Sequence, residues 1–122
     1  MKTILIVEDQ KDMRQLLCTT LGQNSRRFLH AGNADEGLVM TREEQPDLVL
    51  LDIMMPGDMD GMDLLHEIRR DNTLSRTRVV IMSALTQQSD KEKALGAGAD
   101  EYLCKPFRLE VLHEIVNRYC ND

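Results

Sequence analysis

The sequence predicts an α/β protein in which a parallel β-sheet is covered by helices on both faces. Three observations support this prediction. Apolar runs of strand length alternate five times with segments of helical periodicity along the 122 residues. The strand-like runs are almost continuously apolar, as in Ile4-Leu5-Ile6-Val7, which is typical of strands buried on both faces. Right-handed crossovers between such strands produce a doubly wound five-stranded sheet with five helices.

The first two strand–helix units are expected within residues 3–44. Residues 3–7 are predicted to form a strand. Residues 11–22 are predicted to form a helix, because its apolar positions share one face: Met13, Leu16, Leu17 and Leu21. Residues 27–31 are a weaker strand candidate. Asn33 and Glu36 resemble a capping box, which predicts a helix from there to about Glu44 that Pro46 ends.

Three further strand–helix units follow. They are expected at residues 47–51 and 61–70, at 78–82 and 88–96, and at 101–104 and 108–119. The helix at 88–96 is polar and only weakly amphipathic. The last helix carries its apolar positions at intervals of three and four: Leu109, Leu112, Val116 and Tyr119. Residues 56–61 and 71–77 have the composition of loops.

Length and composition indicate a single soluble domain that spans residues 1–122. There is no Trp, and Phe and Tyr together number four, so the core must be aliphatic. The net charge of −6 disfavours direct binding of nucleic acid by this domain. No apolar stretch approaches the ~18 residues that span a bilayer, and the first residues do not resemble a signal peptide. A cytoplasmic protein without membrane contact is therefore expected.

The cysteines also favour a reducing compartment. Cys18, Cys104 and Cys120 are odd in number and form no C-x-x-C pair, so three reduced thiols are expected. Redox sensing by an exposed Cys120 is an alternative that no other feature supports.

Chemically active side chains follow four of the predicted strands. Glu8 and Asp9 end the first run, Asp52 ends the third, Ser83 ends the fourth, and Lys105 follows the fifth. The carboxyl ends of parallel strands share one edge of the sheet, and ligands of doubly wound folds bind beyond that edge. Three acids, a hydroxyl and an ammonium group are therefore expected to converge there.

This set of groups suits a divalent cation and a phosphoryl group. Clustered carboxylates repel one another unless a cation neutralises them, and Mg²⁺ prefers such hard oxygen ligands. A carboxylate can also attack phosphorus, so Asp52 is the candidate nucleophile. Lys105 and Ser83 would then contact the phosphoryl oxygens. Taken one at a time, the acids are also compatible with an ordinary solvated turn, and Lys105 with a surface lysine.

Together these motifs closely resemble the response-regulator receiver domain, the phosphoacceptor half of two-component signalling. The resemblance extends from about Thr3 to Tyr119. It rests on motifs in a fixed order: Glu8-Asp9, Asp52, Met55-Pro56-Gly57, Met59-Asp60-Gly61, Ser83-Ala84, Gly96-Ala97-Gly98-Ala99-Asp100-Glu101-Tyr102 and Lys105-Pro106-Phe107.

The resemblance implies both a fold and a set of partners. The sheet order would be 2-1-3-4-5, as in flavodoxin-like folds. The phosphoryl group would come from a phosphohistidine on a sensor histidine kinase or a histidine phosphotransfer protein. The surface from residue 85 to 119 would signal to an output domain or downstream protein, and phosphorylation-dependent homodimers are possible in the family. Such a domain is a switch rather than a turnover enzyme, although it promotes its own phosphorylation and dephosphorylation.

The resemblance also implies residue roles. Asp52 would be the phosphoacceptor, with Mg²⁺ held by Asp9, Glu8, Asp52 and the backbone carbonyl of Met54. Lys105, before a cis Pro106, and Ser83 would contact the phosphoryl group. Tyr102 would turn inward when Ser83 is drawn towards it.

The chain departs from the usual pattern in one loop, and two apolar residues near the acceptor bear on the lifetime of the phosphorylated state. The loop at residues 56–61 is one residue longer than is typical. Met54 and Leu85, two residues past the acceptor and the hydroxyl, are apolar, so neither can orient water for hydrolysis. A phosphorylated state that is not unusually short-lived is therefore predicted.

Three other functions fit the sequence less well. A phosphatase of the haloacid-dehalogenase type needs an acid at position 54, where this chain has Met54. A flavin or nucleotide binder needs a Gly-rich phosphate loop after the first strand, where this chain has the acidic run at residues 8–12. A pseudo-receiver, a pure protein-binding module, would not need Asp9, Asp52, Ser83 and Lys105 all to be present.

Overall fold

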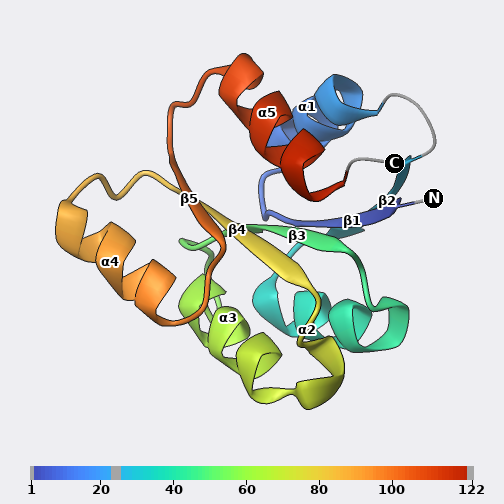
Figure 1. The fold of residues 1–122 in the computed structure, drawn as a ribbon, viewed down its shortest axis with the longest axis vertical. Helices are drawn as coiled ribbons and strands as arrows, with labels where there is room; N and C mark the ends of the chain where they lie inside the picture. Colours follow the sequence, from blue (N-terminus) through green and yellow to red (C-terminus); the bar gives the residue numbers. More distant parts are fainter. Residues whose placement is uncertain (1, 23–25, 121–122) are drawn as a thin grey trace.

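The computed structural model describes residues 2–22 and 26–120 and contains the five predicted strand–helix units (Figure 1). The elements are β1 (Lys2–Val7), α1 (Lys11–Leu21), β2 (Arg26–Ala31), α2 (Ala34–Glu44), β3 (Leu48–Asp52), α3 (Gly61–Arg70), β4 (Arg78–Ser83), α4 (Gln88–Gly96), β5 (Glu101–Cys104) and α5 (Leu109–Tyr119). A short 3₁₀ helix, η1 (Asn72–Leu74), lies in the predicted loop before β4.

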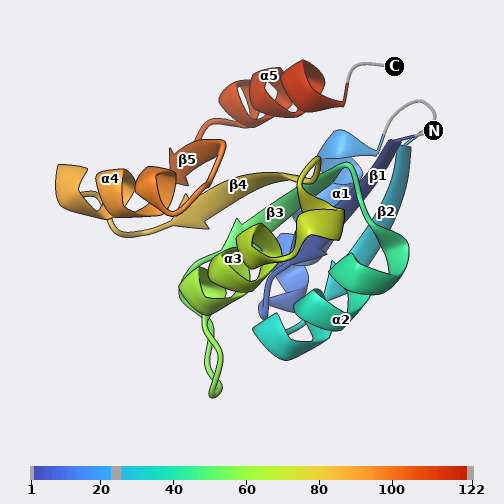
Figure 2. The same ribbon diagram turned by 60° about the horizontal axis from the view of Figure 1, so that its bottom comes forward.

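The five strands form one parallel sheet in the order β2-β1-β3-β4-β5, which confirms the predicted flavodoxin-like order (Figure 2). Ile6 of β1 lies opposite Leu50 of β3, and Leu50 lies opposite Val80 of β4. This register brings the carboxyl ends of β1, β3 and β4 to one edge.

Two apolar layers enclose the sheet, because successive strand residues point to opposite faces. Ile4, Ile6 and Leu50 pack towards α1 and α5 with Leu17 and Leu112. Leu5, Val7, Val49 and Leu51 pack on the other face, where α2, α3 and α4 lie (Figure 1). The strand residues of both layers are fully buried, as their unbroken apolar sequence predicts.

Several surface assignments differ from the sequence prediction. Leu16 is 47% exposed, because Leu17 and Leu21 face the sheet and Leu16 lies about 100° round the helix from Leu17. Leu109, at the start of α5, is 38% exposed. Cys120 is buried rather than exposed, which removes the observation behind its proposed redox role.

The helix caps also differ in detail. Asn33 accepts a hydrogen bond from the backbone of Glu36 at 2.8 Å, but the Glu36 carboxylate accepts from Gly32 rather than from Asn33. The predicted box is therefore only half formed. A reciprocal capping box exists at the start of α3, where Asp60 and Asp63 each accept from the other's backbone.

Gly61 allows the start of α3 to pack closely against the backbone at the end of β3. A Cβ atom at this position would lie 2.5 Å from Ile53 Cα and 2.6 Å from the carbonyl oxygen of Asp52. The Gly61 amide instead donates to the Ile53 carbonyl at 3.2 Å. The close approach of the two backbones helps to position Asp52.

Arg69 joins α3 to the edge of the sheet that lies opposite the Asp52 end of β3. Its guanidinium donates to the carbonyls of Thr77 and Gly98, each at 2.8 Å, and to Asp100 Oδ2 at 2.9 Å. Asp100 also accepts from the Val79 amide at 2.8 Å. The amino ends of β4 and β5 are thereby joined to α3.

Within the described residues, no helix has both the length and the apolar character needed to cross a membrane.

Candidate functional site

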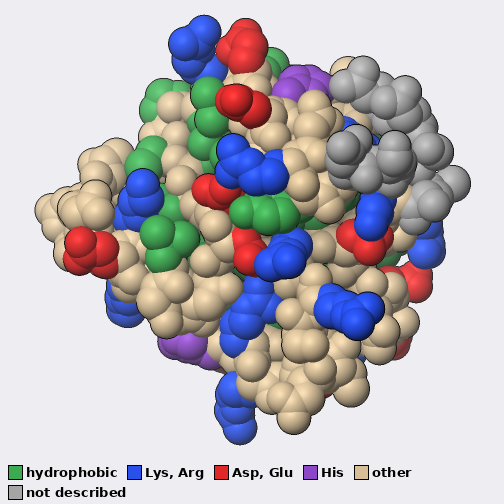
Figure 3. Space-filling model, viewed as in Figure 1, with side chains coloured by type: hydrophobic (Ala, Val, Ile, Leu, Met, Phe, Trp, Pro, Cys, Tyr) green, Lys and Arg blue, Asp and Glu red, His purple; other side chains and the backbone are tan. Residues whose placement is uncertain are grey.

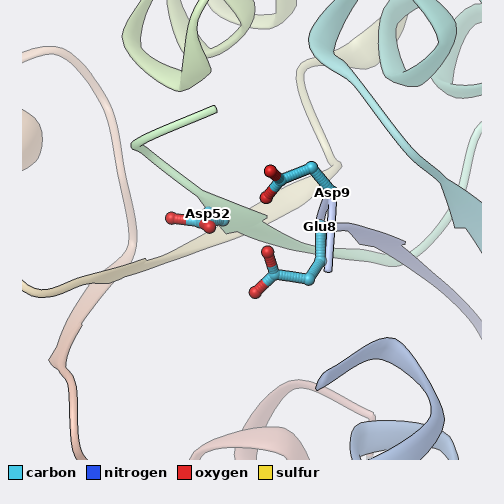
Figure 4. A group of neighbouring side chains, drawn as sticks. All are labelled: Glu8, Asp9 and Asp52. Atoms are coloured by element: carbon cyan, nitrogen blue, oxygen red, sulfur yellow. The ribbon is translucent and has the colours of Figure 1, made fainter. Parts of the chain in front are cut away.

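The three acids predicted to converge do so at the carboxyl edge of the sheet. Glu8 and Asp9 follow β1, and Asp52 is the last residue of β3 (Figure 4). One carboxylate oxygen from each lies within 4.8 Å of the other two. Glu8 is fully buried and Asp52 is 5% exposed, whereas Asp9 faces solvent. The cluster therefore has a buried floor and one open side.

Lys105 supplies the positive charge of the site. Its Nζ lies 3.1 Å from Glu8 Oε1 and 3.3 Å from Asp52 Oδ2. The Lys105–Pro106 peptide bond is cis, as the resemblance implied. The Lys105 amide donates to the Ser83 carbonyl at 2.7 Å, which holds the chain after β5 against the end of β4.

Burial and the neighbouring charges shift the pKa values of Glu8 and Lys105. Burial, together with hydrogen bonding and repulsion from Asp52, raises the pKa of Glu8 from 4.5 to about 7, against the opposing effect of Lys105. Burial alone would lower the pKa of Lys105. Its hydrogen bond to Glu8 and the charges of Asp52 and Glu8 outweigh that effect and raise this pKa above its ordinary value.

The donor set fits a hard divalent cation. Carboxylate oxygens are the preferred ligands of Mg²⁺, and the exposure of Asp9 leaves room for the water ligands that Mg²⁺ retains. Burial and the neighbouring Asp52 raise the pKa of Glu8 despite the contact with Lys105, so a bound cation would favour the ionised form of this carboxyl. An acidic pocket able to hold a metal ion is thus present.

The hydroxyl and the aromatic residue of the prediction meet at Leu85. Ser83 is buried, and its Oγ accepts from the Leu85 amide at 3.0 Å. The Tyr102 hydroxyl donates to the Leu85 carbonyl at 2.8 Å. The backbone of Leu85 therefore links the end of β4 to the middle of β5. Nothing in the sequence identified this carbonyl as the acceptor, because a backbone contact leaves no mark on residue type.

Met54 contributes backbone polarity and an apolar rim. Its amide donates to Asp52 Oδ1 at 3.0 Å, and its side chain is 56% exposed. Together with Leu85 it borders a hollow of about 510 Å³; Ile53, Met55, Asp60, Met62, Asp90 and Lys93 complete the lining. The two positions expected to flank the acceptor are thus both at the rim.

The raised pKa of Glu8 predicts a pH dependence of stability in metal-free protein. Between its ordinary pKa and about 7, folded Glu8 holds a proton that the unfolded chain has released. Stability from this group is complete below the ordinary pKa and is lost as the pH rises towards 7. The free energy of unfolding should fall over this interval by at most about 3 kcal/mol.

Urea unfolding at a series of pH values in the presence of chelator measures this effect. Glu8→Gln should flatten the dependence over that interval. An equally steep fall in the variant would assign the titration to another group.

The fold and the site together define a flavodoxin-like protein whose sheet edge carries an acidic cluster able to hold a metal ion. The sequence matches the response regulator receiver domain family over residues 4–117. The chain therefore belongs to this family, whose members are the phosphoryl-acceptor switches of two-component response regulators.

Similar proteins include both long and short members of the family. The KDP operon transcriptional regulatory protein KdpE of Escherichia coli strain K12 is 39% identical over 107 residues, covering 88% of this chain and 46% of KdpE. Protein PilH of Pseudomonas aeruginosa is 34% identical over 117 residues, covering 96% of both chains. The chain thus spans about half the length of KdpE and nearly all of PilH.

A solved structure gives the same picture. The receiver domain of the Francisella response regulator 1452 superposes with a TM-score of 0.89 at 30% identity, covering 98% of this chain and 96% of that one.

Proposed function

We propose that Asp52 accepts a phosphoryl group, with Mg²⁺, from the phosphohistidine of a sensor histidine kinase or a histidine phosphotransfer protein. The observation that carries the proposal is the position of the Asp52 carboxylate. It lies with Glu8 and Asp9 inside 4.8 Å, and Lys105 Nζ is 3.3 Å away. A nucleophile, a cation site and a fixed positive charge are thereby combined.

Each side chain has a defined part in the transfer. Asp52 presents Oδ2 as the attacking oxygen while the Met54 amide holds Oδ1, which fixes the plane of the carboxylate. Lys105 exchanges its contact with Asp52 for the incoming phosphoryl oxygens, and Ser83 offers its hydroxyl to one of them. Glu8 and Asp9, with Asp52 and the Met54 carbonyl, would hold Mg²⁺, which supplies positive charge to neutralise the transferring group.

The proposed switch couples this site to the surface formed by α4, β5 and α5. Movement of Ser83 towards a phosphoryl oxygen would alter the hydrogen bond that its Oγ accepts from the Leu85 amide. Because the Leu85 carbonyl accepts a hydrogen bond from the Tyr102 hydroxyl, this movement would also affect Tyr102. Hydrophobic side chains gather over β5 between α4 and α5 (Figure 3). Leu95 of α4 and Leu109 of α5 are each 38% exposed. This surface is the proposed contact for an output domain, a downstream protein or a second copy.

The other assignments are proposed on the same footing. Residues 1–122 would form one receiver domain acting in the cytoplasm, where kinases of this type present their phosphohistidine. The domain would be a switch whose only reactions are its own phosphorylation and dephosphorylation. Charges of both signs are interspersed on the face drawn in Figure 3, which fits the proposal that this domain does not itself bind nucleic acid.

Intact-protein mass after incubation with acetyl phosphate tests the proposal. A gain of one phosphoryl group is expected with Mg²⁺ and not with chelator. Asp9→Ala should lose most of this gain, because Asp9 is one of the three acids of the cation site. No gain from acetyl phosphate or from a phosphorylated histidine phosphotransfer protein would indicate a protein-binding module instead.

Lys105→Ala is expected to slow phosphorylation by roughly 10–100-fold, because the fixed charge on the transferring group is lost. Its Nζ pairs with two acids of the site, Glu8 and Asp52, so folding should be less affected. Stopped-flow phosphorylation and urea unfolding, compared at equal pH, separate the two effects. Lys91→Ala, an exposed lysine on α4, is the charge-matched control. A Lys105→Ala protein phosphorylated at the wild-type rate would refute the assigned role.

The phosphorylated form is expected to persist for minutes or longer. Met54 and Leu85 border the acceptor and are exposed, and neither carries a group that orients water. Decay of the phosphorylated mass with Mg²⁺ present gives the lifetime. Met54→Asn should shorten it by supplying a hydrogen-bonding group at the rim. A wild-type lifetime of seconds would contradict this prediction.

A further inference from the structure

Cys18 and His30 form a close pair on the side of the molecule where α1 meets the edge strand β2. Cys18 Sγ lies 3.1 Å from His30 Nε2 and 3.9 Å from Nδ1. His30 is exposed and Cys18 is half-buried. The two residues come from different elements, so the contact is made by the fold and not by sequence proximity. No part of the phosphoryl chemistry uses them.

The pair opens into a hollow of about 460 Å³ with a cationic lining. Lys11 and Arg14 of α1 line it, and Glu36 is its single acid; Gln15 completes the lining. A partly exposed thiol in contact with an imidazole, at a hollow that two cations line, is an environment in which protein thiols can react. The excess of positive charge favours a reaction partner that carries carboxylates.

A metal ion fits this pair less well than thiol chemistry does. Stable sites for thiolate- and imidazole-binding metals usually have four ligands. Among residues 2–22 and 26–120, the one group of three or more His, Cys, Asp or Glu ligand atoms is that of Glu8, Asp9 and Asp52. Cys18 and His30 therefore offer two ligands without a third nearby.

We propose that Cys18 is a site of reversible mixed-disulfide formation with an anionic low-molecular-weight disulfide, and that His30 is its general base. Sγ attacks one sulfur of the disulfide while its proton passes to His30 Nε2. The S–S bond breaks, its electron pair leaves with the second sulfur, and that thiolate takes the proton back from the imidazolium. Cys18 is oxidised to the mixed disulfide, and half of the small disulfide is released as thiol.

The need for a base follows from the burial of the thiol. Burial raises the pKa of Cys18 above its ordinary value, so at neutral pH the group is a thiol rather than a thiolate. A neighbouring base that removes the proton during attack then controls the rate. Cys104 provides an internal comparison, because it is exposed and its nearest polar contact is a backbone carbonyl, that of Leu85 at 3.9 Å.

Glutathione disulfide is the probe for the test. The full chain is incubated with it near neutral pH, and the mixed disulfide at each cysteine is followed by peptide mass spectrometry. His30→Gln should slow modification of Cys18 by about tenfold or more and leave that of Cys104 unchanged. The pH dependence of the rate at Cys18 should also differ between the wild type and the variant. Equal rates at Cys18 in both proteins would overturn the proposal.

A second arm tests the choice of an anionic partner. Arg14→Gln should slow the reaction with glutathione disulfide more than the reaction with the uncharged 2-hydroxyethyl disulfide. Equal slowing of both would refute an anionic preference. Cys18→Ser should remove the adduct at position 18, retain that at Cys104 and leave acetyl phosphate uptake unchanged, so this result is independent of the role assigned to Asp52.

Discussion

Asp52→Asn is expected to lower phosphoryl uptake by at least about a thousandfold, because an amide oxygen at this position is not an adequate nucleophile. The change preserves the shape of the side chain and the acceptor for the Met54 amide. The fold should therefore remain intact. Intact mass after acetyl phosphate treatment, and circular dichroism of the same sample, provide the two readings.

The same substitution should also change the stability of metal-free protein. Asp52 helps to raise the pKa of Glu8, so removing its charge should weaken the fall in stability between pH 4.5 and 7. The loss of the Lys105 contact at 3.3 Å opposes any gain. Asp58→Asn, an exposed acid in the following loop, has the same charge change and should leave both properties unaltered. A phosphorylated Asp52→Asn protein would place the acceptor elsewhere.

Gly61→Ala is expected to destabilise the domain by roughly 2–4 kcal/mol. The added methyl group would meet two backbone atoms, Ile53 Cα at 2.5 Å and the Asp52 carbonyl oxygen at 2.6 Å. Backbone cannot move aside as a flexible side chain can, so α3 must shift away from the end of β3. Because that end carries Asp52, phosphoryl uptake should decrease as well.

Gly96→Ala is the matched control for this substitution. Gly96 ends α4, and a Cβ atom there would have no neighbour within 4 Å. Alanine should be neutral or stabilise by up to about 1 kcal/mol, because it restricts the unfolded chain. Urea unfolding of both variants gives the comparison. A Gly61→Ala protein as stable as Gly96→Ala would show that the two backbones separate without cost.

The sequence predicted those parts of the fold that depend on long apolar patterns. Unbroken runs such as Leu48-Val49-Leu50-Leu51 mark strands buried on both faces, and the structure buries all four residues. Helix surfaces were less predictable. Leu16 is apolar and correctly spaced, yet half of it remains exposed, because a helix on a sheet buries only a narrow stripe.

The position of the site was predictable from the sequence, but its detailed contacts were not. The convergence of Glu8, Asp9 and Asp52 follows from the strand ends alone. The contacts of Lys105 with Glu8 and Asp52 depend on the path of the chain after β5, which no local pattern specifies. The capping box of Asp60 and Asp63 was missed because an Asp-x-x-Asp pair lacks the usual Ser/Thr and Glu/Gln signature.

Arg69 has a consequence for how the domain changes shape. Through Thr77, Gly98 and Asp100 it fastens the starting points of two neighbouring strands to one helix, at the side of the sheet remote from Asp52. At the far ends of the same strands the sheet itself stays paired, since the Lys105 amide donates to the Ser83 carbonyl. The β4–α4 loop that follows is attached through the backbone of Leu85, by hydrogen bonds with the Ser83 and Tyr102 side chains. A disturbance at these two side chains can therefore reorient the β4–α4 loop and α4 while the strand order and register stay unchanged.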